Sequence, residues 1–224
     1  MAEQMARRRA SAASLLETLG RLAPEIFPIS HRLHLTNRSQ LESTMIKLTN
    51  TPHRHLASTI LSKLVATLNR LPENASLQTI AAVFSFLPLD IHDVANFVNE
   101  DPKTYHRESI ITTKQFELLV LTWLPGQASP IHNHAGSKCI VLPLRGFPVE
   151  TVYYPTPSGA FTKTTSRHSP HSVLAGEDAD IHTITNPPTA QQSLVTLHAY
   201  FPPLKNMETF SIKNRKLIKQ QTAF

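Results

Sequence analysis

Apolar side chains recur at helical spacing within the first hundred residues of the chain. One long stripe keeps an apolar residue on the same face of each turn until Pro72, which cannot continue a helix. Ser76 is suited to cap a second helix that runs to Phe86, and Asp90 stands in the same position before a segment that ends at Asn99. These segments are predicted to be helices that face the core. The long stripe consists of Leu56, Ile60, Leu61, Leu64, Val65, Leu68 and Leu71.

The pattern changes near Ile110, where short runs of Val, Leu, Ile, Thr and aromatic residues begin, separated by Pro and Gly. Runs of this kind are typical of β-strands, and many short strands at regular spacing favour a sandwich or a barrel. The predicted strands are 116–124, 139–144, 149–154, 172–174, 180–185 and 193–201.

This change of pattern divides the chain into four parts. Residues 1–50 are predicted to form a helical extension, and residues 51–104 a helical region packed on the barrel. We expect the barrel itself over residues 105–210, and we interpret residues 211–224 as a basic C-terminal tail. The predicted fold class is therefore mainly β, with an N-terminal helical region.

Composition limits the kinds of partner that the chain can have. The chain has 224 residues, of which 41% are hydrophobic, so it can bury a sizeable core. Its formal net charge of +6 comes from Lys and Arg gathered at the two ends without interleaved aromatic residues, so we expect no nucleic-acid partner. No apolar run approaches the roughly 20 residues of a membrane span.

Location and assembly are predicted from the same composition. The single cysteine, Cys139, allows no disulfide within the chain and argues against a secreted scaffold. The Arg- and Ser-rich start faintly resembles an organelle transit peptide, but Glu3 and Glu17 count against that interpretation. We therefore expect a cytoplasmic protein without a membrane partner, and a monomer.

Spacing separates the histidines that could bind a metal from the other members of a set of 12. His132 and His134 follow a Pro-Gly turn, and in an extended chain residues two apart point to the same face, so the pair could hold a metal ion. The similar pair His53 and His55 lies between a proline and a helix start and is interpreted as a loop. Candidates for a third ligand are His182, His168 and His171.

The segment from Gly126 to Gly146 resembles the first motif of the cupin family, G-x5-HxH-x3,4-E-x6-G. The segment from His182 to Asn186 matches the H-x3-N ending of the second cupin motif, which favours His182 over the other two candidates, although the upstream Pro and Gly of that motif are absent. The resemblance implies a cupin jelly-roll barrel. Cys139 lies close to the position of the motif's glutamate, so the expected ligand set is three neutral imidazoles without a carboxylate.

Further segments resemble the cysteine dioxygenase family, which belongs to the cupin superfamily. HNHAGSKC resembles its HxH followed by a cysteine five residues on, and the segment from Thr196 to Pro203 resembles its S-x-H-x-Y-S-P-P stretch. Tyr105-His106-Arg107 resembles the family's Y-x-R segment, and Trp123 matches a tryptophan before the first histidines. The resemblance covers roughly residues 90–210. Thr196 and Phe201 each replace a family serine, and the Phe201 departure leaves open whether the peptide before Pro202 is cis.

The resemblance implies an enzyme that binds Fe(2+) through His132, His134 and His182 and oxidises a small thiol with O2. L-Cysteine would become cysteine sulfinic acid, with its thiolate and amine on the iron. Arg107 would hold the substrate carboxylate, with Tyr105 and Tyr200 beside it. The implied catalytic residues are Thr196, His198 and Tyr200, which share one strand face as a hydroxyl–imidazole–phenol relay, and Cys139, which would form a thioether crosslink with Tyr200.

Three alternatives stay open at this point. The thiol could instead be 3-mercaptopropionate or cysteamine, although Arg107 favours an amino-acid thiol, because the related mercaptopropionate dioxygenases have glutamine there. Three imidazoles would equally suit a zinc hydrolase or isomerase on the same barrel. A cupin that only senses a small ligand would need a partner module, and the N-terminal helices lack a basic recognition pattern.

Overall fold

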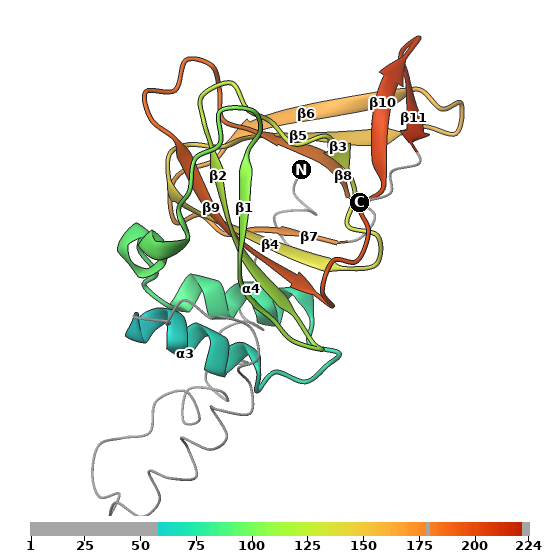
Figure 1. Cartoon of the computed structure of the whole chain (residues 1–224). Helices are drawn as coiled ribbons and strands as arrows, with labels where there is room; N and C mark the ends of the chain where they lie inside the picture. The colour runs from blue at the N-terminus through green and yellow to red at the C-terminus, as the bar shows by residue number, and fades with distance from the viewer. Residues whose placement is uncertain (1–57, 178–179, 221–224) are drawn as a thin grey trace, which may run out of the picture. The chain divides into compact units, whose positions relative to one another are not determined.

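The computed structural model describes residues 58–177 and 180–220, which are folded mainly as β-strands (Figure 1). The strands form two antiparallel sheets. In spatial order, sheet one contains β1 (His106–Thr112), β2 (Glu117–Trp123), β9 (Leu194–Phe201), β4 (Lys138–Arg145) and β7 (Leu174–Gly176). Sheet two contains β11 (Lys216–Gln220), β10 (Thr209–Lys213), β3 (Ile131–His132), β8 (Ile181–Thr185), β5 (Val149–Pro155) and β6 (Phe161–Arg167). The predicted fold class, a mainly β cupin barrel, is confirmed.

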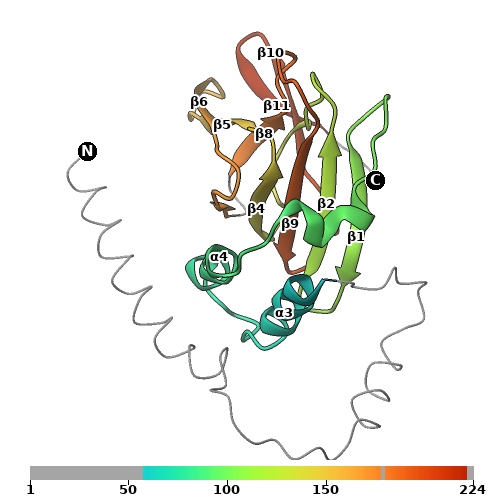
Figure 2. The ribbon, with the colours of Figure 1, turned by 90° about the vertical axis from the view of Figure 1, so that its left-hand side faces the viewer.

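In the described part of the chain, three helices precede the strands and lie together on one side of them (Figure 2). They are α3 (Thr59–Leu68), α4 (Leu77–Phe86) and the 3-10 helix η1 (Ile91–Phe97). The hydroxyl of Ser76 accepts from the Thr79 amide at the start of α4, and Asp90 caps η1, as predicted. Among the described residues, no single helix has the length and apolar character needed to cross a membrane; only the bent pair of α4 and η1 passes that test together.

The three central strands of sheet one, β2, β9 and β4, are buried on both faces, which explains their continuous apolar runs. All eight residues of β9 are buried, and six of the seven residues of β2 are buried. Helix α4 packs against β4 and β7, and η1 packs against β1. A strand covered on both faces needs apolar residues at every position, whereas a half-exposed strand alternates. The peptide bond between Phe201 and Pro202, after β9, is cis.

Most of the strands that the sequence did not reveal lie in sheet two, and one, β1, lies at the edge of sheet one. β6 pairs with β5, but six of its seven residues are exposed, and its Thr- and Lys-rich sequence has no apolar face. Residues 211–220, assigned above to a basic tail, instead form most of the β10–β11 hairpin. Its turn is Asn214-Arg215, both at positive φ, which lacks the usual glycine signal for a hairpin. The predicted extension over residues 1–50 and the pair His53 and His55 lie outside the described residues.

Candidate metal centre

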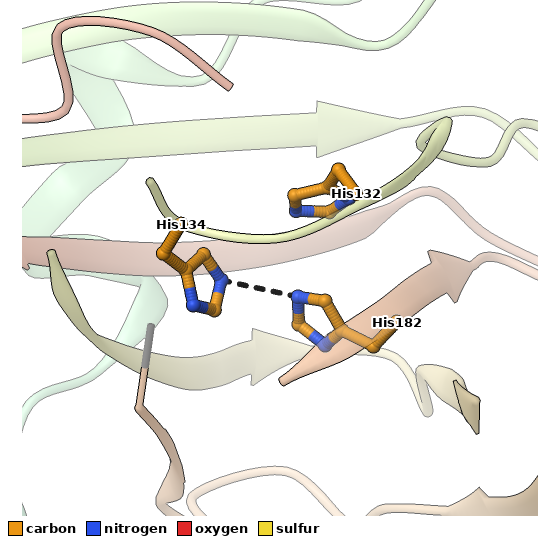
Figure 3. A group of neighbouring side chains, drawn as sticks. All are labelled: His132, His134 and His182. Carbon is orange, nitrogen blue, oxygen red and sulfur yellow. Dashed lines mark hydrogen bonds between the residues drawn. The ribbon is translucent and has the colours of Figure 1, made fainter. Parts of the chain in front are cut away.

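Three histidines converge between the two sheets. One ligand nitrogen from each of His132, His134 and His182 can be chosen so that all three lie within 4.8 Å of one another. The Nε2 atoms of His134 and His182 are 3.1 Å apart, and a dashed line joins them in Figure 3. The three residues are nearly inaccessible to solvent, with exposures of 5%, 1% and 5%. Of the three candidates for the third ligand, His182 is the one that the fold brings to the HxH pair.

Strand pairing explains why residues fifty positions apart in the sequence meet. His132 on β3 stands directly opposite His182 on β8. β3 ends at His132, so His134 lies just beyond the strand, before a turn through Ala135 and Gly136. Both residues have positive φ, a conformation that glycine adopts without strain. The turn reverses the chain into β4 and leaves both imidazoles on the same side.

Two residues in the C-terminal part of the chain hold the HxH segment from outside. The backbone N–H of Asn133, the residue between the two histidines, donates to the Glu208 carbonyl at 3.0 Å, and its side-chain amide donates to the Glu208 carboxylate at 2.9 Å. Next along the chain, Thr209 on β10 pairs with His132. The hairpin that was predicted to be a tail therefore flanks the first ligand.

Each imidazole has an oxygen partner at its outer nitrogen. The Nδ1 atoms of His132, His134 and His182 lie 2.9 Å from the Pro130 carbonyl, 3.4 Å from the Glu177 carbonyl and 2.7 Å from the Glu150 carboxylate, respectively. Carbonyl and ionised carboxylate oxygens only accept, so the proton of each neutral ring is on Nδ1 and the Nε2 lone pair points inward. The facing lone pairs of His134 and His182 then repel unless a cation lies between them. The cluster therefore fits a metal ion that takes imidazole ligands.

Burial keeps the imidazole of His132 neutral. It lowers the pKa of His132 to about 3, helped by the neighbouring His182 and His134 and opposed by the hydrogen bond to Pro130. A neutral imidazole is the form that binds metals. Among the described residues, no carboxylate joins the cluster, so the ligand set has no charge of its own.

A second group of side chains comes from sheet one. Thr196, His198 and Tyr200 alternate along β9 and share one face, as predicted. The Thr196 hydroxyl lies 2.9 Å from Nε2 of His198, and Nδ1 of His198 lies 3.3 Å from the Tyr200 hydroxyl. At the other end of this chain, the indole N–H of Trp123 donates to Thr196 at 2.9 Å. The Tyr200 ring lies 5.9 Å from that of His134, so this chain of hydrogen bonds reaches the histidine cluster.

The donors in this chain fix its direction. The indole nitrogen of Trp123 can only donate, so among the described residues the buried Thr196 hydroxyl has one acceptor for its own hydrogen, Nε2 of His198. The proton of His198 is then on Nδ1 and is donated to the Tyr200 oxygen. Burial holds the pKa of His198 well below its usual value and raises that of Tyr200 well above it, so both groups are neutral. The Tyr200 hydroxyl therefore keeps its hydrogen.

Cys139 lies beside Tyr200. The two residues are directly opposite each other on β4 and β9, and the thiol hydrogen-bonds to the phenol. Burial raises the pKa of the thiol, whose residue is only 1% exposed. Cys139 is a neutral thiol in the core and does not have the low pKa of a nucleophilic cysteine.

A cavity lies beside both groups. Its lining includes His132, His182 and Tyr200, and also Tyr105 and Arg107. Arg107 hydrogen-bonds to Tyr105, and the Tyr105 ring stacks on Trp123 with centroids 4.2 Å apart. The only positive charge on this lining is thus held beside Tyr105, where it can pair with an anion.

Glu150 is the residue of this region that sequence reasoning missed. It is the only acidic residue between Glu117 and Glu177, and it occupies an inward position in the otherwise uncharged strand β5. An isolated carboxylate in such a strand is a signal that could have been noticed. His168, one of the rejected ligand candidates, binds its other oxygen at 3.2 Å.

Comparison with known proteins agrees with this geometry. Residues 50–213 match the sequence profile described as cysteine dioxygenase type I. The chain is 25% identical over 143 residues to cysteine dioxygenase type 1 of Homo sapiens and to that of Pongo abelii, an alignment that covers 62% of this chain and 71% of each relative. Among solved structures, a protein of Thermus thermophilus has a TM-score of 0.42 at 18% identity, over 51% of this chain and 99% of that one. A cupin superfamily protein of Desulfitobacterium hafniense has a TM-score of 0.38 at 14% identity, over 48% of this chain and 86% of that one.

Proposed function

The chain belongs to the cysteine dioxygenase type I family, and on this basis we propose that it is a non-haem iron(II) dioxygenase that converts L-cysteine and O2 to cysteine sulfinic acid. The observation that carries the proposal is the convergence of three neutral imidazoles, without a carboxylate, beside a tyrosine that can donate a hydrogen bond. A cavity with one arginine on its lining completes the arrangement.

His132, His134 and His182 would hold the metal through Nε2. Iron(II) would supply the redox chemistry that adds both atoms of O2 to the substrate sulfur and makes a sulfinic acid. Imidazole ligands suit zinc as well as iron, so the choice of iron rests on the family.

Arg107 and Tyr105 would bind the amino-acid end of the substrate. The guanidinium group offers a planar fork of donors that matches a carboxylate, and its hydrogen bond to Tyr105 limits its rotation. Tyr105 is itself held by its stack on Trp123. A carboxylate bound at Arg107 would leave the thiol end of cysteine directed into the cavity, towards the histidines.

Tyr200 would act as a hydrogen-bond donor to the bound reactants. Its oxygen accepts from His198, and its raised pKa keeps its own hydrogen in place. The Trp123–Thr196–His198 chain would fix the orientation of the phenol. We also propose a thioether between Cys139 and a ring carbon of Tyr200: the bond would form with loss of two hydrogens, which O2 would accept, and intact-protein mass would detect their loss.

The direct test is aerobic incubation of the iron-loaded protein with L-cysteine, with mass detection of the sulfinate and parallel measurement of O2 uptake. We expect one O2 consumed for each sulfinate formed, and no turnover in a His132→Ala protein. A protein that binds zinc and consumes no O2 with L-cysteine, 3-mercaptopropionate or cysteamine would contradict the proposal.

Arg107→Gln tests the choice of substrate. Loss of a charge-assisted hydrogen bond of about 1.5–3 kcal/mol should lower kcat/KM for L-cysteine about tenfold or more, and should affect cysteamine, which lacks a carboxylate, much less. Arg167→Gln is the matched control, because Arg167 lies on β6 over the Phe147 ring and does not line the cavity. Equal losses with both substrates would refute the carboxylate contact.

A further inference from the structure

Glu150 joins two histidines across sheet two. One carboxylate oxygen lies 2.7 Å from Nδ1 of His182, and the other lies 3.2 Å from Nε2 of His168. The register explains the contact, because Val152 on β5 pairs with His182 on β8 and Glu150 is the next residue on the same face of β5. The carboxylate is mostly buried, with 18% of its side chain exposed.

The three histidines of the cluster differ in their outer partners. His132 and His134 face neutral backbone carbonyls, whereas His182 faces a carboxylate at the shortest distance of the three. The Glu150 carboxylate is therefore one imidazole ring away from the histidine cluster.

We propose that Glu150 is a positioning residue that orients His182 and strengthens it as a metal ligand. Its hydrogen bond fixes the His182 ring with Nε2 directed inward and raises the electron density on that nitrogen. It also supplies, from the outer side of the ring, the negative charge that the three-imidazole set lacks. The inference rests on the proposed metal site, but not on the identity of the thiol.

His168 has a supporting role in this arrangement. It occupies the second oxygen of Glu150, and its backbone N–H donates to the Pro148 carbonyl at 2.9 Å. Both oxygens of the carboxylate are thus engaged, so the side chain cannot rotate away from His182 without breaking two contacts. A second cavity, lined by Glu150, His168, His182 and Tyr154, lies on this side of the cluster.

The test measures the affinity of the metal-free protein for Zn²⁺ and for Co²⁺, by competition with a chelator, in wild type and in Glu150→Gln. Glutamine keeps the shape and can still accept from Nδ1, but it removes the charge. We expect affinity to fall about 10–100-fold, the usual cost of losing such an outer partner, and the absorption bands of bound Co²⁺ to shift. The unfolding free energy of each metal-free protein is measured alongside.

Glu108→Gln is the matched control. Glu108 also contacts an imidazole, that of His106 at 3.1 Å on β1, but His106 is not part of the cluster. We expect this control to bind both metals like wild type. If Glu150→Gln does not fold, Glu150→Asp keeps the charge but is too short for the 2.7 Å contact, and it should also bind more weakly.

Wild-type affinity in either Glu150 variant, or an equal loss in Glu108→Gln, overturns the inference. The two levels of failure are distinguishable in this experiment. A wild-type protein that binds no metal contradicts the proposed metal site itself, whereas tight binding that does not depend on residue 150 contradicts only the role given to Glu150.

Discussion

Two buried threonines on neighbouring strands should respond in opposite ways to the same substitution. Thr196 is 0% exposed, and its hydroxyl accepts from Trp123 and donates to His198. Thr122 is 1% exposed, and among the described residues its hydroxyl has no hydrogen-bond partner. Valine has nearly the shape of threonine but lacks the hydroxyl. The pair therefore isolates the contribution of the hydrogen bonds from that of packing.

The expected magnitudes follow from what each change leaves unpaired. Thr196→Val leaves the indole N–H of Trp123 and Nε2 of His198 buried without partners. A buried polar group left unpaired costs about 1–3 kcal/mol, so we expect a loss of about 2–4 kcal/mol. Thr122→Val removes a hydroxyl that is already unpaired, so the free energy of unfolding should stay the same or rise by up to about 1 kcal/mol.

Urea unfolding of the metal-free proteins provides the measurement. For a domain of this size, the loss in Thr196→Val corresponds to a fall in Tm of about 5–15 °C. Thr196→Ser keeps the hydroxyl and should lie within about 1.5 kcal/mol of wild type, because it loses one methyl group. Equal changes in the two valine variants would refute the hydrogen-bond assignment around Thr196, and with it the direction inferred for the chain to Tyr200.

Three further predictions concern single residues near the cluster. Cys139, the only cysteine, is buried with a raised pKa, so a maleimide should label the folded metal-free protein at neutral pH only as fast as it unfolds; labelling at the rate of a free thiol would contradict this. In Gly176→Ala the new Cβ would lie 3.4 Å from Cε1 of His134 and 3.3 Å from Asp180, so Zn²⁺ affinity by chelator competition should fall several-fold with little change in stability, and unchanged affinity would count against so close an approach to His134. Because burial lowers the pKa of His198, below pH about 6.5 the unfolded chain binds a proton that the folded chain does not, so the unfolding free energy in urea should decrease as pH falls. This decrease should be shallower in His198→Gln, and identical slopes would contradict it.

Part of the fold could be predicted from the sequence because some strands are buried on both faces. β2 and β9 are covered on both faces, so their apolar runs are uninterrupted and their positions could be predicted closely. The alternation of Thr196, His198 and Tyr200 also survives in the sequence, because it depends only on the two-residue period of a strand. The HxH spacing predicted the paired ligands for the same reason, although β3 proved to be only two residues long.

The parts that were not predicted depend on partners far away in the sequence. The exposed strand β6 has no apolar face, so its sequence lacks the apolar–polar alternation that would have predicted a strand paired with β5. The role of Glu150 follows from the register of β5 against β8, which no local pattern specifies. The hairpin of β10 and β11 could not be predicted either. Its lysines are interspersed with apolar residues, so the segment resembles a charged tail.

The position of that hairpin determines when the histidine cluster can be completed during synthesis. All three histidines have left the ribosome once residue 182 has emerged, but β3, which bears His132, still lacks the strand that pairs with its second edge. Glu208 and Thr209, which hold Asn133 and His132, come only later in the chain. A nascent chain therefore carries all three imidazoles before it has the contacts that hold the HxH segment in place. The order of translation thus makes β10 the last element that the cluster requires.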